Sequence, residues 1–328
     1  MRKLFFCFCI ISCFCCFVSA QETAQDSAES EGKEDKDQGD FRNFFVPDLS
    51  FQALQIGEED WVFSPSASLR YIRTKKAGVK SSQPDSIVAS VSYTPNIFTS
   101  GLGDDNVKYL HSLSLMGSTG FGKNNLLALV SSNGEVLFSD IRTLFGGLLY
   151  TREIFKKKSF SLSLGAGLVV GDLGIKIRGV SIYFFPLPMF SLSYSSDILN
   201  ASLSLMGLNL TLFPKKMFRF EGQCGITRFD SIRDLTFDCK LVYYPMHNTG
   251  AGDFLAVAAG VMNEKASFSL RDKEKYGWQY YCVYGEVDAS LVQIKAGYNF
   301  NGRNMLDDEP VSDLHKGFFA SIKAMYFF

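Results

Sequence analysis

Residues 316–328 constrain the fold more than any other stretch, because apolar and polar side chains alternate through them. Side chains of a β-strand point alternately to opposite faces, so residues two apart share a face. Ser321 and Lys323 mark one face. The other face is apolar throughout: Phe318, Ala320, Ile322, Ala324, Tyr326 and Phe328. A soluble chain seldom ends on such a run of aromatics, although the last strand of a soluble β-sandwich remains the alternative.

This stretch resembles the closing-strand signal of bacterial outer-membrane β-barrels, in which a terminal Phe follows apolar or aromatic residues at alternate positions. Gly317, Tyr326 and Phe328 are the matching residues that we expect to form the assembly signal. The resemblance covers the last strand, and no named family is recognised across the rest. It implies a transmembrane antiparallel up-and-down barrel, insertion by the barrel-assembly machinery and contact with outer-membrane lipids.

Residues 1–20 predict a secretory signal peptide. Arg2 and Lys3 form a basic start, an apolar run follows, and Ser19 and Ala20 supply a small-residue cleavage site. The apolar run is too short for a comfortable transmembrane helix. A lipoprotein signal is the alternative, since cysteines lie in the run, but no small-residue box precedes them. We expect an exported protein with a cleaved leader, located in the outer membrane.

Two further segments precede the main body. Residues 21–40 are acidic and almost free of apolar side chains, which predicts a disordered periplasmic arm. Residues 41–59 are apolar enough to pack, either as an extra strand or as a plug in the barrel mouth. The net charge of −1 gives no reason to expect nucleic acid as a partner.

The body, residues 60–328, predicts a single barrel because short alternating runs recur and no apolar run reaches the length of a spanning helix. We expect about 14 strands, with 12 as the alternative because 126–138 could contain a turn. Counting back from Phe328 places the charged connections 74–85, 264–276 and 301–315 at the outer end. The connection 96–107 is then long at the end where turns should be short. The predicted strands are 61–73, 86–95, 108–117, 126–138, 141–152, 158–170, 180–194, 199–212, 216–228, 234–245, 253–263, 277–287, 290–300 and 316–328.

Charged side chains alternate with apolar ones on several predicted strands, which predicts a lumen of mixed charge. If the hairpin 216–245 pairs residues whose numbers sum to 461, Glu221 lies opposite Lys240, and opposite charges across strands help to fix register. A register that sums to 463 would instead oppose Cys224 and Cys239. We favour two unpaired cysteines that face lipid over a disulfide. The expected lumen-facing charges are Arg219, Glu221, Asp238, Lys240, Glu286, Lys295 and Lys323.

No pattern in the sequence predicts an enzyme, a metal site or a cofactor. A lipid-active barrel enzyme would need a base beside a nucleophile. His111 shares its strand face with Leu113 instead of a serine, His247 falls in a predicted turn, and His315 in a loop without an adjacent serine. The sequence favours a porin-like channel for passive passage of small solutes. The alternatives are a structural or surface-interaction barrel and, less favoured, a lipid-active enzyme.

Overall fold

The computed structural model consists of β-strands joined by turns and loops. No helix in the part of the chain that it describes is long and apolar enough to span a membrane. The described residues are 41–75, 84–102, 107–171, 176–177, 180–205, 207–226, 235–247, 253–271, 274–307, 309–314 and 316–326. The strands are β1 (Phe41–Gln55), β2 (Trp61–Lys75), β3 (Ser86–Leu102), β4 (Val107–Phe121), β5 (Asn124–Gly134), β6 (Leu144–Lys157), β7 (Phe160–Gly171), β8 (Lys176–Ile177), β9 (Val180–Ser181), β10 (Phe184–Ser195), β11 (Leu199–Ser204), β12 (Gly207–Leu212), β13 (Phe218–Ile226), β14 (Leu235–Tyr243), β15 (Ala256–Ser269), β16 (Lys275–Asp288), β17 (Val292–Leu306), β18 (Glu309–Leu314) and β19 (Gly317–Met325).

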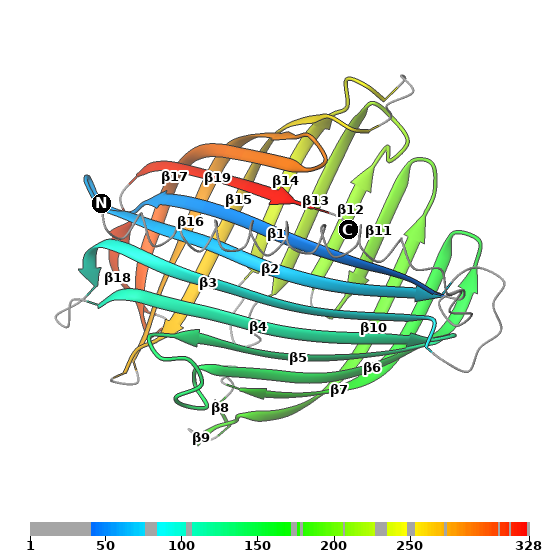
Figure 1. The fold of residues 1–328 in the computed structure, drawn as a ribbon, viewed down its shortest axis with the longest axis horizontal. Helices are drawn as coiled ribbons and strands as arrows, with labels where there is room; N and C mark the ends of the chain where they lie inside the picture. The colour runs from blue at the N-terminus through cyan, green and yellow to red at the C-terminus, as the bar shows by residue number, and fades with distance from the viewer. Residues whose placement is uncertain are drawn as a thin grey trace, which may run out of the picture. The chain divides into compact units, whose positions relative to one another are not determined.

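These strands form a closed antiparallel barrel (Figure 1). Each wall strand pairs with the next one along the chain, and β19 pairs with β1, with Phe51 opposite Ile322 and Ala53 opposite Ala320. Among the described residues, 16 strands make the wall, while β18 pairs antiparallel with the end of β17 that β19 leaves unpaired, and β8 pairs only with β9. Closure pairs the backbone groups that an open sheet would leave unpaired at its edges, and a barrel needs this in lipid.

The two ends of the barrel differ in their connections. At one end, which we call the terminal end, β1 begins, β19 ends and the turns 122–123, 158–159 and 289–291 are short. The opposite end, the loop end, carries β18 and the longer connection 135–143. Short turns at one end are typical of outer-membrane barrels, although the connections 76–85 and 244–255 at the terminal end are longer.

The predicted all-β barrel is confirmed, but the predicted strand number of 14, or alternatively 12, is wrong. Residues 41–55 form β1, which is a strand of the wall. The run 199–212, predicted as one strand, is the hairpin of β11 and β12, in which Leu203 lies opposite Leu208. The apolar spacing slips there because the chain reverses direction.

This reversal also exchanges the two ends of the barrel for every earlier strand. The expectation that 74–85 lies at the same end as 264–276 and 301–315 is therefore wrong. Lys75 and Asp85, which flank the connection, lie at the terminal end, where the Lys75 amide donates to the Asp85 carbonyl at 2.9 Å. Residues 76–83 lie outside the described part. The prediction of a long connection at 96–107 is also wrong, because residues 96–102 belong to β3 and Val107 begins β4, at the loop end.

The outer surface of the wall is apolar along most strands. Leu241 is 67 % exposed, and Phe218 and Phe318 are each 65 % exposed. In water, such a large apolar surface would promote association. It is the surface that a barrel presents to lipid. Further large exposed apolar residues on the wall strands are Leu69, Val91, Leu115, Leu126, Val130, Leu148, Leu164, Leu203, Leu208, Val257, Val261, Val283, Val287, Ile294 and Ile322.

Candidate pore lining

The paired strands β13 and β14 carry charged and apolar residues on opposite faces. Their register sums to 461 and places Glu221 opposite Lys240, whereas Phe220 lies opposite Leu241 on the other face. The Lys240 ammonium reaches Glu286 on β16, past the intervening strand β15. Side chains of strands that are not neighbours meet across the concave side of the wall. Lys240 and Glu221 therefore lie inside the barrel.

Interior charges form a chain of alternating sign across β13 to β17. The Lys240 Nζ lies 2.8 Å from Glu286 Oε1 and 3.7 Å from Glu221 Oε2. The Lys295 Nζ lies 3.4 Å from both Glu286 Oε2 and Asp238 Oδ2. The Glu286 side chain is buried, and its Oε2 accepts no hydrogen bond although Lys295 is near. Burying charges is costly unless each is paired, so these side chains depend on one another.

Tyr284 supports the same chain of charges from β16. Its hydroxyl donates a hydrogen bond to Asp238 on β14. Its ring lies beneath the Lys295 ammonium, with Nζ 4.2 Å from the ring centroid. A cation above an aromatic face gains electrostatic stabilisation. Tyr284 thus holds an acid and a base in place together.

A second group of contacts joins strands that lie farther apart around the wall. Glu264 on β15 accepts hydrogen bonds from the Tyr280 hydroxyl and from Gln52 Nε2 on β1, the latter at 3.3 Å. Between β15 and β1 stand β16, β17 and β19, so this contact also crosses the interior. Near the terminal end, Lys323 pairs with Asp48 at 2.7 Å.

Arg219 occupies the terminal rim of the interior. Its guanidinium lies 2.6 Å from the Asp253 carboxylate and 4.0 Å from the centroid of the Tyr244 ring. His247 Nδ1 lies 2.8 Å from Asp253, and its Nε2 lies 3.0 Å from the Lys215 carbonyl oxygen. The hydrogen bond with His247 and the charge of Arg219 hold the Asp253 pKa below its usual value. Both ring nitrogens of His247 are engaged, so neither is free to activate a nucleophile.

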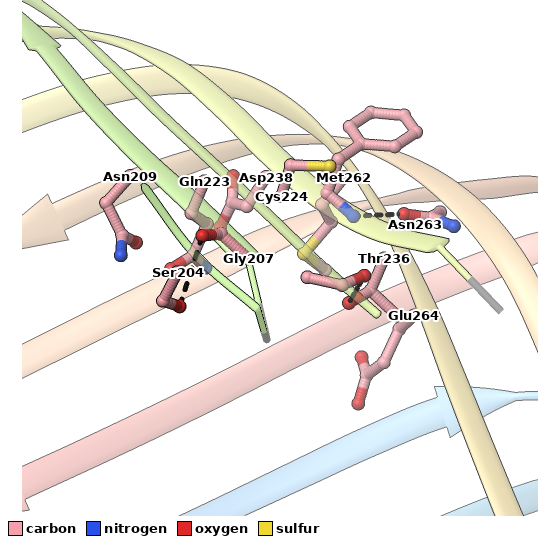
Figure 2. Close-up of a pocket in the computed structure, with 12 residues that line it drawn as sticks. Ser204, Gly207, Asn209, Gln223, Cys224, Thr236, Asp238, Met262, Asn263 and Glu264 are labelled. Carbon is pink, nitrogen blue, oxygen red and sulfur yellow. Dashed lines mark hydrogen bonds between the residues drawn. The ribbon is translucent and has the colours of Figure 1, made fainter. Parts of the chain in front are cut away.

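Two cavities lie along the wall in this region. The first has a volume of about 450 Å³ and is lined by residues of β11 to β15, among them the polar residues Asn209, Gln223, Asp238 and Glu264 (Figure 2). The second, of about 350 Å³, lies along β15, β17, β19 and β1 to β3. Hydroxyl groups and two ammonium groups contribute to its lining: Ser50, Ser64, Ser66, Thr94, Ser321, Lys295 and Lys323. Both cavities are bordered by Met262 and Glu264.

Two apolar clusters narrow the interior toward the loop end. The larger, which we call the aromatic cluster, joins residues of β1 to β4 to residues of β15 to β19. Within it Trp278 stacks on Phe268 at 5.3 Å between centroids and meets the Phe98 ring edge-on at 5.9 Å. The smaller cluster centres on Val169 of β7 and Leu187 of β10, on the other side of the barrel. The interior wall therefore combines a polar middle with apolar clusters toward the loop end.

The sequence singled out several of these side chains and missed others. Glu286, Lys295 and Asp238 lie together in the chain of charges, while Arg219 and Lys323 make separate pairs near the terminal end. Asp48, Glu264, Tyr280 and Tyr284 were not singled out. The inward face of β16 cannot be recognised from the sequence, because aromatic or aliphatic residues occupy both of its faces. Buried residues Trp278, Tyr280, Cys282 and Tyr284 alternate there with Tyr281, Val283 and Val287.

Gly317 has a local packing role where the barrel closes. A Cβ at this position would lie 2.5 Å from Gln55 Oε1 and 2.8 Å from Gln55 Cβ. The Gly317 amide donates to Asn299 Oδ1, and Asn299 Nδ2 donates to the Gln55 carbonyl at 3.0 Å. Tyr326 is exposed on the outer surface. Phe328 lies outside the described residues, so the assembly role of these residues stays a prediction.

The described cysteines and histidines form no reactive pair. Cys224 lies opposite Phe237 and Cys239 opposite Gly222, and Cys224, Cys239 and Cys282 are free. The His111 Nδ1 lies 2.9 Å from the Tyr93 hydroxyl, on an outward face. His315 lies outside the described residues. Within the described part of the chain, no group of three or more His, Cys, Asp or Glu residues could hold a metal ion.

Comparison with known proteins gives only weak structural similarities. No protein-family model matches the chain, and no curated protein matches it in sequence. OccAB4 of Acinetobacter baumannii is 10 % identical, with a TM-score of 0.38 over 90 % of this chain and 100 % of that one. A BenF-like porin from Pseudomonas fluorescens Pf-5 is 8 % identical, with a TM-score of 0.32 over 88 % of this chain and 98 % of that one. OpdK of Pseudomonas aeruginosa, solved with vanillate, has the same identity and TM-score over 88 % and 99 %.

These values assign the chain to no family and give it no substrate. The barrel itself is established by the pairing of its strands and by its apolar outer surface. The chain is thus a closed antiparallel β-barrel with an outer surface suited to lipid.

Proposed function

We propose that this barrel is an outer-membrane channel for passive passage of small polar solutes. The observation that carries the proposal is the contrast between the two sides of the wall. The outside is apolar, while the inside holds hydroxyls, amides and paired charges around two cavities. A barrel of this strand number encloses enough width for a water-filled lumen. Because both charge signs share the interior, its ion selectivity should be weak.

The proposal includes an orientation and a route of export. The terminal end would face the periplasm and the loop end the outside, as the difference in connection length suggests. The predicted leader, residues 1–20, and the predicted acidic arm, residues 21–40, lie outside the described part of the chain. Their export role is part of the proposal. The test treats intact cells that carry Arg271→Cys or Lys123→Cys with a membrane-impermeant maleimide, and the wild type gives the background. Labelling of Arg271→Cys but not of Lys123→Cys would support this orientation.

Planar-bilayer recording of the purified barrel tests the channel. We expect discrete conductance steps that grow with salt concentration, and liposome swelling with small neutral sugars. A folded barrel that never conducts would overturn the proposal and leave the surface-interaction role, in which loop-end residues contact a partner, as the better account. An outer-membrane fraction that lacks the protein would overturn the location.

A further inference from the structure

The hairpin of β15 and β16 leaves the wall near the loop end. β15 and β16 each have 14 residues, and the described parts of β13 and β14 have nine each. β14 accompanies β15 only as far as the pair Phe237 and Asn263, while β15 and β16 stay paired to Ser269 and Lys275. In the described residues, residues 264–268 of β15 therefore pair with no strand on their β14 side.

Asn263 marks the point of departure. Its buried side-chain amide accepts a hydrogen bond from the Phe237 amide and donates to the Leu235 carbonyl at 2.7 Å. These backbone groups of β14 would otherwise continue the ladder with β15. Because a side chain satisfies them, the backbone of β15 is free to turn away from β14. A register irregularity also lies between β16 and β17 here, where residues 301 and 302 of β17 stand opposite the single residue Tyr280 of β16.

The tip of the hairpin reaches the opposite wall (Figure 1). Ser269 pairs with Gly134 at the end of β5, and the Glu135 amide donates to the Ser269 carbonyl at 3.0 Å. The Ser269 hydroxyl donates to the Arg142 carbonyl at 3.1 Å, and Arg271 Nε lies 3.0 Å from Glu135 Oε1. β5 and β15 are diametrically opposed in the wall. The strands β6, β7, β10, β11, β12, β13 and β14 separate them on one side, and β16, β17, β19, β1, β2, β3 and β4 on the other.

On the β1 to β4 side of this bridge, aromatic side chains fill the loop end, and the second cavity lies behind them toward Ser50 and Lys323. The aromatic cluster of Phe98, Phe268, Tyr276 and Trp278 packs between the hairpin and β1 to β4. The larger cavity, lined by β11 to β15, lies on the other side. We propose that the β15–β16 hairpin is a fixed partition that closes half of the loop-end mouth, so that solutes pass only on the β6 to β14 side. This inference rests on the proposed channel function and names what limits solute size.

Gly134 offers a direct way to detach the tip. A Cβ at this position would lie 2.6 Å from the Ser269 carbonyl oxygen, so Gly134→Val must push the hairpin away. Gly117→Val is the matched control, because nothing lies within 4 Å of a Cβ there. We expect Gly134→Val to raise single-channel conductance and to admit larger sugars in liposome swelling, while Gly117→Val keeps the wild-type values. If Gly134→Val does not fold, the double variant Glu135→Ala with Arg271→Ala replaces it, because it removes the ion pair without adding bulk. This variant should also raise conductance and admit larger sugars.

A cross-link distinguishes a fixed partition from a moving gate. Glu135→Cys with Arg271→Cys, in a chain whose Cys224, Cys239 and Cys282 are replaced by serine, should form a disulfide readily. Oxidation should leave conductance unchanged, and a fall on oxidation would show that the hairpin normally opens. If the wild type conducts and a folded Gly134→Val or double-alanine barrel keeps the same solute size limit, the partition is overturned but the channel is not. A silent wild type would overturn the channel and the partition together.

Discussion

The ammonium group of Lys240 on β14 lies 2.8 Å from the buried carboxylate of Glu286 on β16, with β15 between them. This pair links strands that share no backbone hydrogen bonds. It belongs to a chain in which Glu221, Asp238 and Lys295 supply further charges of alternating sign. The interior wall from β13 to β17 is therefore stabilised by linked charges, and the removal of a central one, such as Lys240, should affect its neighbours.

Lys240→Met should destabilise the barrel substantially. Glu286 is only 5 % exposed, and without Lys240 its carboxylate would depend on Lys295 alone. Removing one partner of a buried ion pair costs about 3 kcal/mol or more. Urea unfolding in lipid vesicles measures this loss. The control is Lys323→Met, whose pair with Asp48 is more exposed and should contribute less than about 1 kcal/mol. Equal losses for both variants would contradict the interdependence of the charges.

Neighbouring residues on β13 should respond in opposite ways to charge changes. Phe220 lies on the outward face, so Phe220→Arg places a charge in hydrocarbon at a cost of roughly 2–4 kcal/mol near the midplane. Glu221 faces inward, so Glu221→Gln should spare folding. It should also shift the reversal potential of the channel in a salt gradient toward anions, because a negative charge leaves the lining. A barrel that tolerates Phe220→Arg but unfolds with Glu221→Gln would invert the two faces.

The sequence could predict these two faces because polar and apolar residues alternate along most of β13 and β14. It could not predict the strand number, because the reversal between β11 and β12 carries Leu205 and Met206 in place of typical turn residues. Nor could it predict the bridge across the mouth. The contact between Ser269 and Gly134 joins residues far apart in the chain, and no local pattern signals it.

Acid should weaken the terminal rim through Asp253. Its folded pKa lies below the usual value, chiefly because of the hydrogen bond with His247. A carboxyl group with a lowered folded pKa adds stability that is present above its unfolded pKa of about 4 and is lost as pH falls through the folded value. The difference in unfolding midpoint between wild type and Asp253→Asn should therefore be largest at pH 6 and shrink toward pH 3. A difference that stays constant would argue that the charge of Asp253 contributes nothing.

Asn299 should prove essential to barrel closure. It is fully buried on β17 and bridges the Gln55 carbonyl of β1 and the Gly317 amide of β19. Asn299→Leu keeps the bulk but leaves both backbone groups unpaired, at about 1–3 kcal/mol each. We expect slower membrane insertion and a lower midpoint of urea unfolding. Both can be measured by the difference in gel mobility between folded, unheated samples and unfolded ones. Asn209→Leu is the control, because Asn209 lies on the exposed lining of the first cavity and should change stability by less than about 0.5 kcal/mol. If both leucine variants insert and unfold alike, the closure does not depend on Asn299.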